Sequence, residues 1–403
     1  MMERKILWIA CSVPCKGISH AGGQTFRYYF FHIANDHRFE VKLIGCDDGM
    51  TDDEIKNDLV GIDYRIVHKG VSKLKKVINL ESQFNPWNRY AGILSNYYAN
   101  EIWKYAKEFK EKGYEPDIII LEWTGIVLMV PKLRKLFPKT AFVASEHDVT
   151  FVGYKRRSEY FKGLKGLVWS SKYKWERKLE LRALGFCDLV FTHNPDNMVL
   201  LEEEGVNFNV LQWLIPYFNN MSNCKKHSNG KDILFFGAMA RAENYLSAIW
   251  FIENVMPKLD DLDIRFVVLG SNPPEQLKRY ESRRIHITGF VNSIVPYFES
   301  SICLVAPLVL GAGIKVKIIE GLSSGIPVIT NAVGIEGIPA YKNREYIHCE
   351  TANEYEDAVR SAYNGKLEKF GEMGKVFIQK TYNLEESLDN YIQKIVSLER
   401  NSK

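Results

Sequence analysis

Short, almost wholly apolar runs recur along the chain, and helix-like segments separate them. In the first half of the sequence five such runs are predicted strands, at 5–11, 41–46, 117–123, 140–145 and 188–193. A strand that is apolar at nearly every position must be buried on both faces, as in a parallel sheet that helices cover on either side. The alternation of strands and helices therefore predicts an α/β fold.

The same alternation starts again after SNCKKHSNGKD at 222–232, a polar stretch that is typical of a linker. Five more strands are predicted, at 232–237, 264–270, 285–289, 302–307 and 326–330. Predicted helices lie at 25–35, 89–112, 174–186, 244–256, 314–324 and 384–400. We predict two Rossmann-like, doubly wound domains that face an interdomain cleft, 1–222 and 223–383, with the C-terminal helix in 384–403 packing back on the first.

The composition is that of a globular protein, with 46% hydrophobic and 25% charged residues among 403. No stretch reaches 18 uncharged apolar residues, so we expect no membrane-spanning helix. The first apolar run is too short for a signal peptide, so a cytoplasmic location is expected. The seven cysteines form no CxxC pair and are expected to be reduced. No HExxH or Cys/His cluster suggests a metal held by the protein.

The segment 308–339, LVLGAGIKVKIIEGLSSGIPVITNAVGIEGIP, combines glycine, lysine and glutamate where a strand gives way to a helix. Gly311 and Gly313 let the backbone approach a ligand closely, and the helix start offers unpaired N–H groups. Lys315 and Lys317 add charge-assisted bonds of roughly 1.5–3 kcal/mol each, more than the ~0.3–1 kcal/mol of a helix dipole. We predict that the lysines hold a diphosphate and that Glu320 binds ribose hydroxyls. The alternative is a tight turn followed by a solvated helix face.

With these residues the segment resembles the C-terminal signature of the retaining glycosyltransferases of family four, the glycosyltransferase group 1 domain. The matching positions are Gly311, Gly313, Lys315, Lys317, Glu320, Gly325, Pro327, Gly334, Glu336 and Gly337. The similarity includes 232–259 and extends over most of the chain, although the first half matches only at short motifs. It implies the GT-B fold, a nucleotide diphosphate-sugar as donor substrate, and transfer without a metal or another cofactor.

Two departures from the family pattern concern the donor. Many relatives carry a glutamate that contacts the donor sugar eight residues before the ribose-binding one, where this chain has Ala312. Many also carry an arginine and a lysine after the first strand of this domain, at positions that spacing assigns to Ala238 and Glu243. Arg241 is either a helper in phosphate binding or a surface arginine. These departures bear on the identity of the donor sugar more than on the type of reaction.

The first domain carries two further motifs, each after a predicted strand. Gly22 and Gly23, in SHAGGQTF at 19–26, resemble the family's glycine loop that closes on the donor diphosphate. His147, in SEHDVTF, resembles the family histidine that contacts the donor sugar near the reacting carbon, and a neutral imidazole can both donate and accept a hydrogen bond. Glu146 or Asp148 is expected to orient its ring. Each motif also has a purely structural interpretation: the two glycines as part of a turn, and His147 as a buried histidine of the core.

Acceptor contacts are expected from Glu122, which ends another strand, and from a basic segment. Residues 151–182 hold ten Lys/Arg and three Asp/Glu, and seven aromatic residues lie among them. Such a mixture suits a lipid headgroup boundary or an anionic acceptor, and we assign acceptor or lipid contact to Lys155, Arg156 and Arg157. The alternative is a solvated helix pair whose aromatics pack on the core. Without a broader basic face, nucleic-acid binding is not expected.

The predicted activity is transfer of a sugar, with retention, from a nucleotide-sugar to a saccharide or lipid-linked acceptor. The resembled branch often works in bacterial polysaccharide or glycolipid synthesis, and the basic segment adds a contact with the inner leaflet of the membrane. Two alternatives remain. One is a nucleotide-sugar epimerase on the same scaffold. The other is a non-catalytic partner subunit of a transferase, for which Ala312, Ala238 and Glu243 would be signs of an eroded site.

Overall fold

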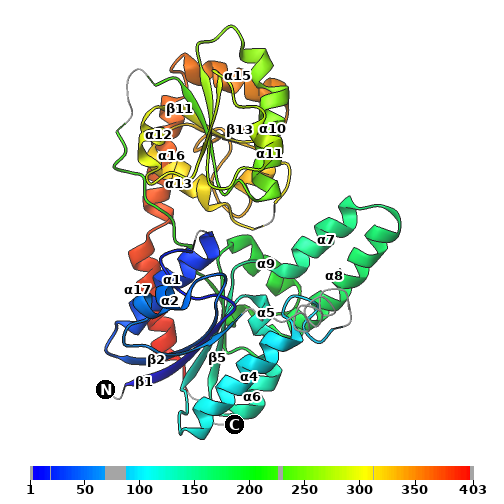
Figure 1. Cartoon of the computed structure of the whole chain (residues 1–403), viewed down its shortest axis with the longest axis vertical. Coiled ribbons are helices and arrows are strands. Elements are labelled where there is room, and N and C mark those ends of the chain that lie inside the picture. The colour runs from blue at the N-terminus through cyan, green and yellow to red at the C-terminus, as the bar shows by residue number, and fades with distance from the viewer. Residues whose placement is uncertain (1–2, 19, 69–87, 226–229, 312, 400–403) are drawn as a thin grey trace. The chain divides into compact units, whose positions relative to one another are not determined.

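The computed structural model describes residues 3–18, 20–68, 88–225, 230–311 and 313–399. The chain forms two units, Met1–Pro216 with Glu385–Lys403, and Tyr217–Leu384. Each unit is a parallel sheet with helices on both faces (Figure 1). The second unit begins before the polar stretch that we predicted as the linker. The backbone N–H of Asn219 donates to Glu320, and that of Met221 donates to Ser323, which ties this part of the chain to the second unit.

The first sheet has the strand order β3-β2-β1-β4-β5-β6-β7, with every pairing parallel. Its strands are β1 (Arg4–Ala10), β2 (Phe39–Cys46), β3 (Asp63–Val67), β4 (Ile118–Glu122), β5 (Ala141–Glu146), β6 (Leu189–Thr192) and β7 (Leu211–Trp213). Its helices are α1 (Ala21–Ala34), α2 (Asp52–Asp58), α4 (Asn96–Glu111), α5 (Thr124–Val127), α6 (Val130–Leu136), α7 (Thr150–Tyr160), α8 (Gly163–Leu184), α9 (Pro195–Glu203) and α17 (Leu384–Ser397).

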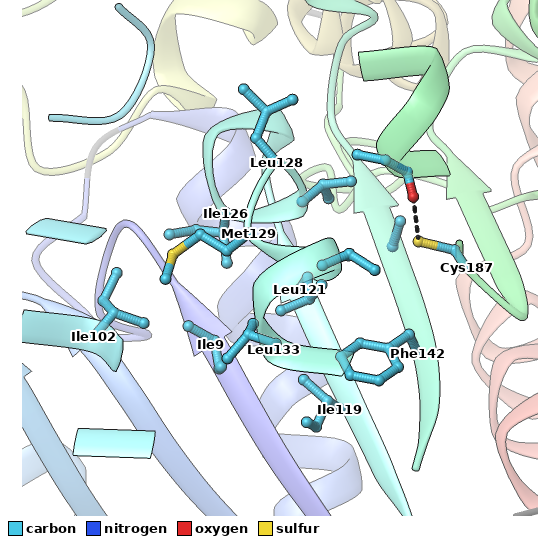
Figure 2. Packing of buried hydrophobic residues seen from close by; sticks show 14 of the residues in the cluster. Ile9, Ile102, Ile119, Leu121, Ile126, Leu128, Met129, Leu133, Phe142 and Cys187 are labelled. Carbon is cyan, nitrogen blue, oxygen red and sulfur yellow. Dashed lines mark hydrogen bonds between the residues drawn. The ribbon is translucent and has the colours of Figure 1, made fainter. Parts of the chain in front are cut away.

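One face of this sheet packs on α4, α6 and α8 in a core of fully buried side chains. Ile9, Ile119 and Leu121 of the sheet contact residues such as Ile102 and Leu133 from the helices (Figure 2). The opposite face packs on α1 and α17, whose Tyr391 and Ile395 are buried there. The Tyr29 hydroxyl donates to the carbonyl of Ile215 at 2.8 Å and lies 2.9 Å from the Ser387 hydroxyl, which fastens α17 to α1.

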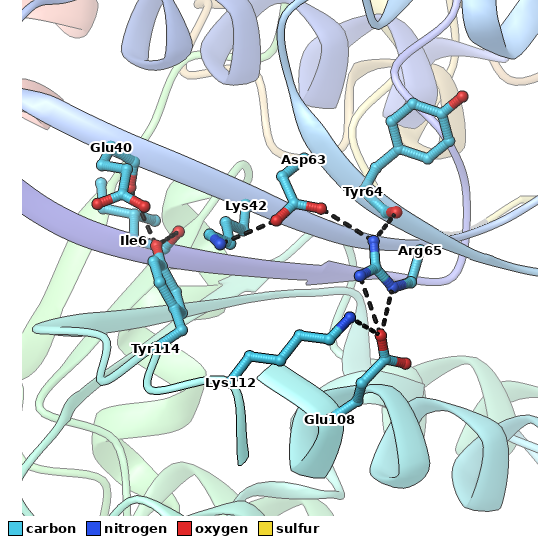
Figure 3. Close-up of polar contacts among 9 residues, drawn as sticks. All are labelled: Ile6, Glu40, Lys42, Asp63, Tyr64, Arg65, Glu108, Lys112 and Tyr114. Carbon is cyan, nitrogen blue, oxygen red and sulfur yellow. Dashed lines mark hydrogen bonds and ion pairs between the residues drawn. The ribbon is translucent and has the colours of Figure 1, made fainter. Parts of the chain in front are cut away.

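Strand β3 is absent from the sequence prediction because its residues, DYRIV, are half polar. It lies at the sheet edge, where polar side chains reach solvent and pair with one another. Asp63 bonds Lys42 at 2.8 Å and Arg65 at 2.9 Å, and Arg65 also bonds Glu108 of α4 at 3.0 Å (Figure 3). The ion pairs fix the edge strand to β2 and α4. The hydroxyl of Tyr114 adds hydrogen bonds to the carbonyls of Ile6 and Glu40.

The second sheet has the strand order β10-β9-β8-β11-β12-β13 and is also parallel throughout. Its strands are β8 (Asp232–Phe236), β9 (Arg265–Leu269), β10 (Ile285–Gly289), β11 (Ser301–Ala306), β12 (Val328–Thr330) and β13 (Ile347–His348). Its helices are α10 (Ala242–Asn254), α11 (Glu275–Lys278), α12 (Val295–Glu299), α13 (Val316–Ser324), α14 (Ala332–Ile335), α15 (Ala352–Tyr363) and α16 (Glu368–Thr381). In each sheet the order reverses beside the unit's first strand, and such a switch point is where open α/β sheets bind ligands.

All ten predicted strands are present, whereas several helix boundaries differ from the prediction. Helix α1 begins at Ala21 rather than at residue 25, because the His20 side chain caps it by accepting from the backbone N–H of Gly23. Gly22 and Gly23 thus lie in the first helical turn and not in a loop. Helix α4 begins only at Asn96, where the Ser95 side chain caps it, and α8 begins at Gly163.

The seven cysteines all lie in the described ranges, and none of them is in a disulfide. Over those same ranges, no helix combines the length and the apolar character that crossing a bilayer requires. No group of three or more His, Cys, Asp or Glu side chains in the described part of the chain is arranged to hold a metal ion.

Candidate functional site

In the second unit, the loop between β11 and α13 has a backbone that only glycine adopts readily. Gly311 has a φ of 152° and Gly313 a φ of 72°. A Cβ at Gly311 would lie 2.9 Å from Cε of Lys315, so the glycine also makes room for the lysine side chain. The loop follows the strand next to the switch point and delivers the chain to the amino end of α13. Ala312 lies outside the described residues.

Lys315 is the residue that precedes α13, and its side chain is nearly buried beside the loop. Its ammonium donates to the carbonyl of Gly313 and lies 3.5 Å from Oε2 of Glu336. A partly buried carboxylate beside it balances much of its charge. Lys315 and Glu336 were both expected from the motif, but their pairing was not, because Lys315 precedes α13 and Glu336 follows α14, 21 positions along the chain.

Lys317 is partly buried in the first turn of α13, and its contacts in the described structure are with neutral groups. Nζ donates to Oδ1 of Asn244 at 2.6 Å and lies 4.7 Å from the centre of the Phe235 ring. Burial, together with the charge of Lys315, lowers the pKa of Lys317 to about 7. An anionic ligand at this point would therefore be met by an ammonium group that the protein itself leaves largely uncompensated.

Glu320 lies one turn after Lys317 and is also buried. Its Oε1 accepts the backbone N–H of Asn219 at 2.9 Å and the side-chain amide of the same residue at 2.7 Å. Burial raises its pKa to about 7. Asn219 holds one carboxylate oxygen in place, and Oε2 remains the atom to which we assign the predicted ribose contact.

Arg241 is the residue before α10 and is largely exposed. It pairs with Glu243 at 2.5 Å, and the charges of both residues act on the pKa of Lys317, in opposite senses. The sequence analysis missed Asn244, which bridges the two parts of the site. Its amide donates to the carbonyl of Ala238 at 2.9 Å while its oxygen accepts from Lys317. Asn244 connects the loop after β8 to α13 across the switch point.

In the first unit, Glu122 at the end of β4 is buried and holds His147. Its Oε1 accepts from the indole of Trp8 at 3.1 Å, and its Oε2 lies 2.8 Å from Nε2 of His147. The prediction that Glu122 faces an acceptor is therefore wrong, because both oxygens are occupied inside the protein. The prediction that Glu146 or Asp148 orients the ring needs the same correction, since Glu122 does so. Glu146 instead accepts from the Thr124 hydroxyl at 2.5 Å.

The ionisation of this pair follows from its burial. Burial raises the pKa of Glu122 to about 7 and lowers that of His147 to about 3, so the imidazole is neutral at pH 7. When Glu122 is ionised it can only accept, so in that form the imidazole proton lies on Nε2 and Nδ1 carries a lone pair. A Cβ at Gly22 would lie 3.2 Å from that Nδ1. The glycine thus lets α1 approach the free edge of the ring.

Gly23 has a different role from its neighbour. Its N–H donates to Nδ1 of His20 at 2.9 Å, so this amide is not open to a phosphate as the sequence predicted. A Cβ there would lie 2.1 Å from Cγ2 of Ile18. Gly23 is needed by the packing of the helix start, whereas Gly22 borders the candidate site.

The structure adds two aromatic neighbours of His147 that the sequence analysis missed. Trp123 has a φ of 68°, a conformation that costs a non-glycine residue ~1–3 kcal/mol, and its ring stacks on His147 with centroids 4.5 Å apart. His193, after β6, lies 4.6 Å from His147 between ring centroids. Its Nδ1 lies 2.9 Å from the Leu214 carbonyl, and no partner lies within reach of its buried Nε2 in the described structure. His193 directly follows a predicted strand. The same signal led the sequence analysis to Glu122 and could have identified His193 as well.

Lys155, Arg156 and Arg157 do not join this group. They lie on the exposed surface of α7, in the helical hairpin that α7 forms with α8 (Figure 1). Arg157 lies 4.8 Å from the ring centre of Trp169 on α8, so its neighbour belongs to the hairpin and not to the Glu122–His147 pair.

Comparisons with known proteins agree with this geometry. Residues 230–364 match the family model described as glycosyl transferases group 1. No curated protein matches the sequence. Among solved structures, the HepE protein of Anabaena in complex with UDP has a TM-score of 0.67 at 11% identity, over 98% of this chain and 100% of that one.

Two further solved structures match over nearly their whole length. Sucrose-phosphate synthase of Thermosynechococcus elongatus has a TM-score of 0.70 at 14% identity, over 98% of this chain and 100% of its own. A glycosyltransferase of Rickettsia africae has a TM-score of 0.61 at 15% identity, over 97% of each chain. The chain thus has the GT-B fold, and its residues 230–364 match the glycosyl transferases group 1 model.

Proposed function

We propose that this protein is a retaining glycosyltransferase that takes its sugar from a nucleotide diphosphate-sugar without the help of a metal ion. The observation that supports the proposal is the partly buried Lys317, whose ammonium contacts the neutral groups of Asn244 and Phe235 in the described part of the chain. It lies at the start of α13, beside the glycine loop of Gly311 and Gly313. Burying an ammonium is costly unless it is paired, and a diphosphate supplies the missing negative charge.

The proposed donor is a uridine or guanosine diphosphate-sugar. The structure of HepE has been solved with UDP, with UDP and glucose, and with UDP-glucose. We propose that this chain also binds a nucleoside diphosphate. From Gly311 through Lys315 and Lys317 to Glu320, the chain offers backbone N–H groups, two ammonium groups and a carboxylate. Diphosphate and ribose present the complementary groups in the same order.

In the proposed reaction, the bond between the anomeric carbon and the diphosphate oxygen breaks, and the acceptor oxygen forms a new bond to that carbon. Negative charge builds on the leaving oxygen as the bond breaks. Lys315, Lys317 and the amides of the 311–313 loop would stabilise that charge in place before the reaction starts. His147, neutral and held by Glu122, is assigned to a hydroxyl of the donor sugar. We assign no protein nucleophile.

The acceptor is proposed to be a saccharide or a lipid-linked saccharide, in bacterial polysaccharide or glycolipid synthesis. The support is the family resemblance together with the basic surface of α7, where Lys155, Arg156 and Arg157 are exposed. The lipopolysaccharide outer core galactosyltransferase WaaB has the same fold, with a TM-score of 0.62 at 13% identity. At that identity the likeness concerns the fold, so the acceptor is a matter for assay.

Calorimetry with UDP and GDP tests the proposal. We expect one of them to bind the wild-type protein and to bind Lys317→Met at least tenfold more weakly, because a charge-assisted bond contributes roughly 1.5–3 kcal/mol. Product analysis with the donor alone then separates the alternatives. Conversion of the sugar without an acceptor would identify an epimerase, and failure to bind any nucleotide would favour a non-catalytic partner subunit.

A further inference from the structure

The hairpin of α7 and α8 carries a feature that the sugar-transfer site does not use. The two helices pack side by side, and the turn between them lies at the end farthest from the first sheet (Figure 1). At its other end, Glu180 of α8 joins the two helices by accepting the backbone N–H groups of Thr150 and Phe151 in the first turn of α7, both at 3.2 Å. Phe151, Ala183 and Leu184 are buried in the core of the first unit and anchor this end of the hairpin. The tip is therefore an extension with a fixed base.

The turn itself is fixed by two glycines. Gly163 has a φ of 61°, which favours glycine, and a Cβ at Gly166 would lie 2.3 Å from the carbonyl oxygen of Phe161. The close approach of Gly166 to Phe161 folds the chain back sharply. It leaves the side chains on either side of the turn at the outer end of the hairpin.

Four large apolar side chains are exposed at this tip. Tyr160 is 70% exposed, Leu164 83%, Leu167 68% and Val168 53%. Leu164, Leu167 and Val168 have the i, i+3, i+4 spacing of one helix face. In the described part of the chain, no other stretch of nine residues exposes more than two large apolar side chains. The tip therefore exposes a continuous apolar patch to solvent, which is the mark of an interaction surface.

Basic side chains surround the apolar patch. Lys155, Arg156, Arg157, Lys162 and Lys165 are all exposed, with Glu159 as the one exposed acid between residues 150 and 175. Two of the three acids in 151–182, Glu176 and Glu180, are buried at the base. The cations also cover aromatic rings, with Lys165 at 3.6 Å from the ring centre of Phe161. The tip is thus strongly positive, because the two buried acids lie away from it and burial raises their pKa, which favours their protonated, uncharged form.

We propose that this tip docks on the surface of a bilayer that contains anionic lipids. An apolar patch ringed by Lys and Arg fits the boundary between headgroups and acyl chains, where leucine side chains enter and cations contact phosphates. The cytoplasmic leaflet carries such anionic lipids. A protein partner would have to supply both an apolar pocket and an acidic rim, whereas a bilayer supplies both over any area. The docking requires no turnover and stands apart from the proposed reaction.

Vesicle flotation with the full chain, without nucleotide, tests the proposal. We expect binding to vesicles of phosphatidylcholine with 30% phosphatidylglycerol to be at least about tenfold tighter than to phosphatidylcholine alone, and to weaken in high salt. Each basic residue near an anionic surface strengthens binding about fivefold, so the triple variant Arg156→Gln, Arg157→Gln, Lys165→Gln should lose most of this preference.

The apolar half of the patch is tested by a second triple variant, Leu164→Ser, Leu167→Ser and Val168→Ser. We expect it to bind anionic vesicles roughly tenfold more weakly or worse and to keep the fold, because these side chains are exposed. Val60→Ser, which changes an equally exposed apolar side chain elsewhere in the first unit, should bind like the wild type. Circular dichroism of each variant checks the fold.

Four results would overturn the proposal. Equal binding of the wild type to neutral and anionic vesicles would remove the charge argument, and full binding by the serine variant would remove the apolar one. A wild-type dimer that becomes monomeric on the serine changes would show that a second copy covers the tip. Tight binding of single-stranded RNA that excludes vesicles would assign the basic surface to a nucleic acid. Failure to bind nucleotides would leave the docking result unaffected.

Discussion

The first unit collects Glu122, His147, Trp123 and Gly22 beside its switch point, whereas the second collects Gly311, Gly313, Lys315 and Lys317. Both sheets begin with the same order, third strand, second, first and then fourth. In both, the residues in question follow the ends of parallel strands or start the next helix. The topology thus decides where a site lies, and the residues after each strand decide which chemistry it has.

The two sites also differ in the charge that they bury. In the first unit, burial holds His147 neutral at pH 7 and raises the pKa of Glu122, so this site suits a neutral, hydroxyl-rich group. In the second unit, the ionisable groups include the partly buried ammonium of Lys317, whose charge an anion would balance. Our proposal accordingly assigns the neutral sugar of the donor to the first set of residues and its charged diphosphate to the second. The predictions below test the division, from the largest expected effect to the smallest.

Replacing Lys317 by methionine should affect the second site most strongly. The change removes the charge and keeps the buried stem, so the fold should survive while turnover falls roughly 10²–10³-fold, as for the loss of a group that stabilises a leaving oxygen. Steady-state rates with a nucleotide-sugar measure this. Lys278→Met, at an exposed lysine of the same unit, is the control and should behave like the wild type. Unchanged turnover in Lys317→Met would contradict the assignment of the diphosphate to this site.

Replacing Gly22 by alanine should affect the first site next most strongly. The added Cβ would lie 3.2 Å from Nδ1 of His147 and 3.4 Å from the indole nitrogen of Trp123, so both rings would have to move. A displacement of a fraction of an ångström is expected to lower turnover about tenfold to a hundredfold. Gly153→Ala, in α7 with open space around it, is the matched control. It should keep full activity and gain up to about 1 kcal/mol of stability. Equal activity of the two variants would exclude His147 from the site.

The pH dependence of nucleotide binding should separate the two sites further. Lys317 has a pKa of about 7 without ligand, and an anion favours its charged form, so binding takes up a proton above pH 7. The Kd for UDP or GDP should then rise about tenfold per pH unit between pH 7 and the pKa of the complex. Calorimetry from pH 6 to 9 measures the slope. Lys317→Met should flatten this alkaline limb, whereas Glu320→Gln should retain it. A slope that persists in Lys317→Met would assign the proton to another group.

The smallest expected effect is on stability, and it concerns the buried acids of the first unit. Burial raises the pKa of Glu176 from 4.5 to about 7. The folded state therefore holds a proton that the unfolded state loses, and stability falls as pH rises from about 4.5 to 7. Glu176→Gln removes this loss and should raise the melting temperature by about 2–4 °C at pH 8 but not at pH 4.5. Glu203→Gln, at an exposed position, should have no effect. A shift of equal size at both pH values would point to a packing effect.

Much of the fold could be predicted from the sequence because its strands are buried on both faces and are apolar throughout. The exceptions are instructive. Strand β3 contains Asp63 and Arg65, whose charges are accommodated only because the strand lies at an edge beside Lys42 and Glu108. Strand β13 has only two residues, too few for any periodic pattern. The start of α1 was misplaced because glycines are typical of loops, whereas here the His20 side chain caps a helix that includes them.

By itself, the sequence determined ten of the strands and the order of glycine, lysine and glutamate at α13, because these features are local along the chain. The order of the strands, and with it each switch point, came from the tertiary structure. Only the tertiary structure decided that Glu122 holds His147, that His193 and Trp123 stand beside it, and that Asn244 contacts Lys317. Those pairs join residues 24 to 73 positions apart. The shifted pKa values of Lys317 and Glu122 depend on the same packing, because desolvation is a property of everything that surrounds a group and not of its neighbours in sequence.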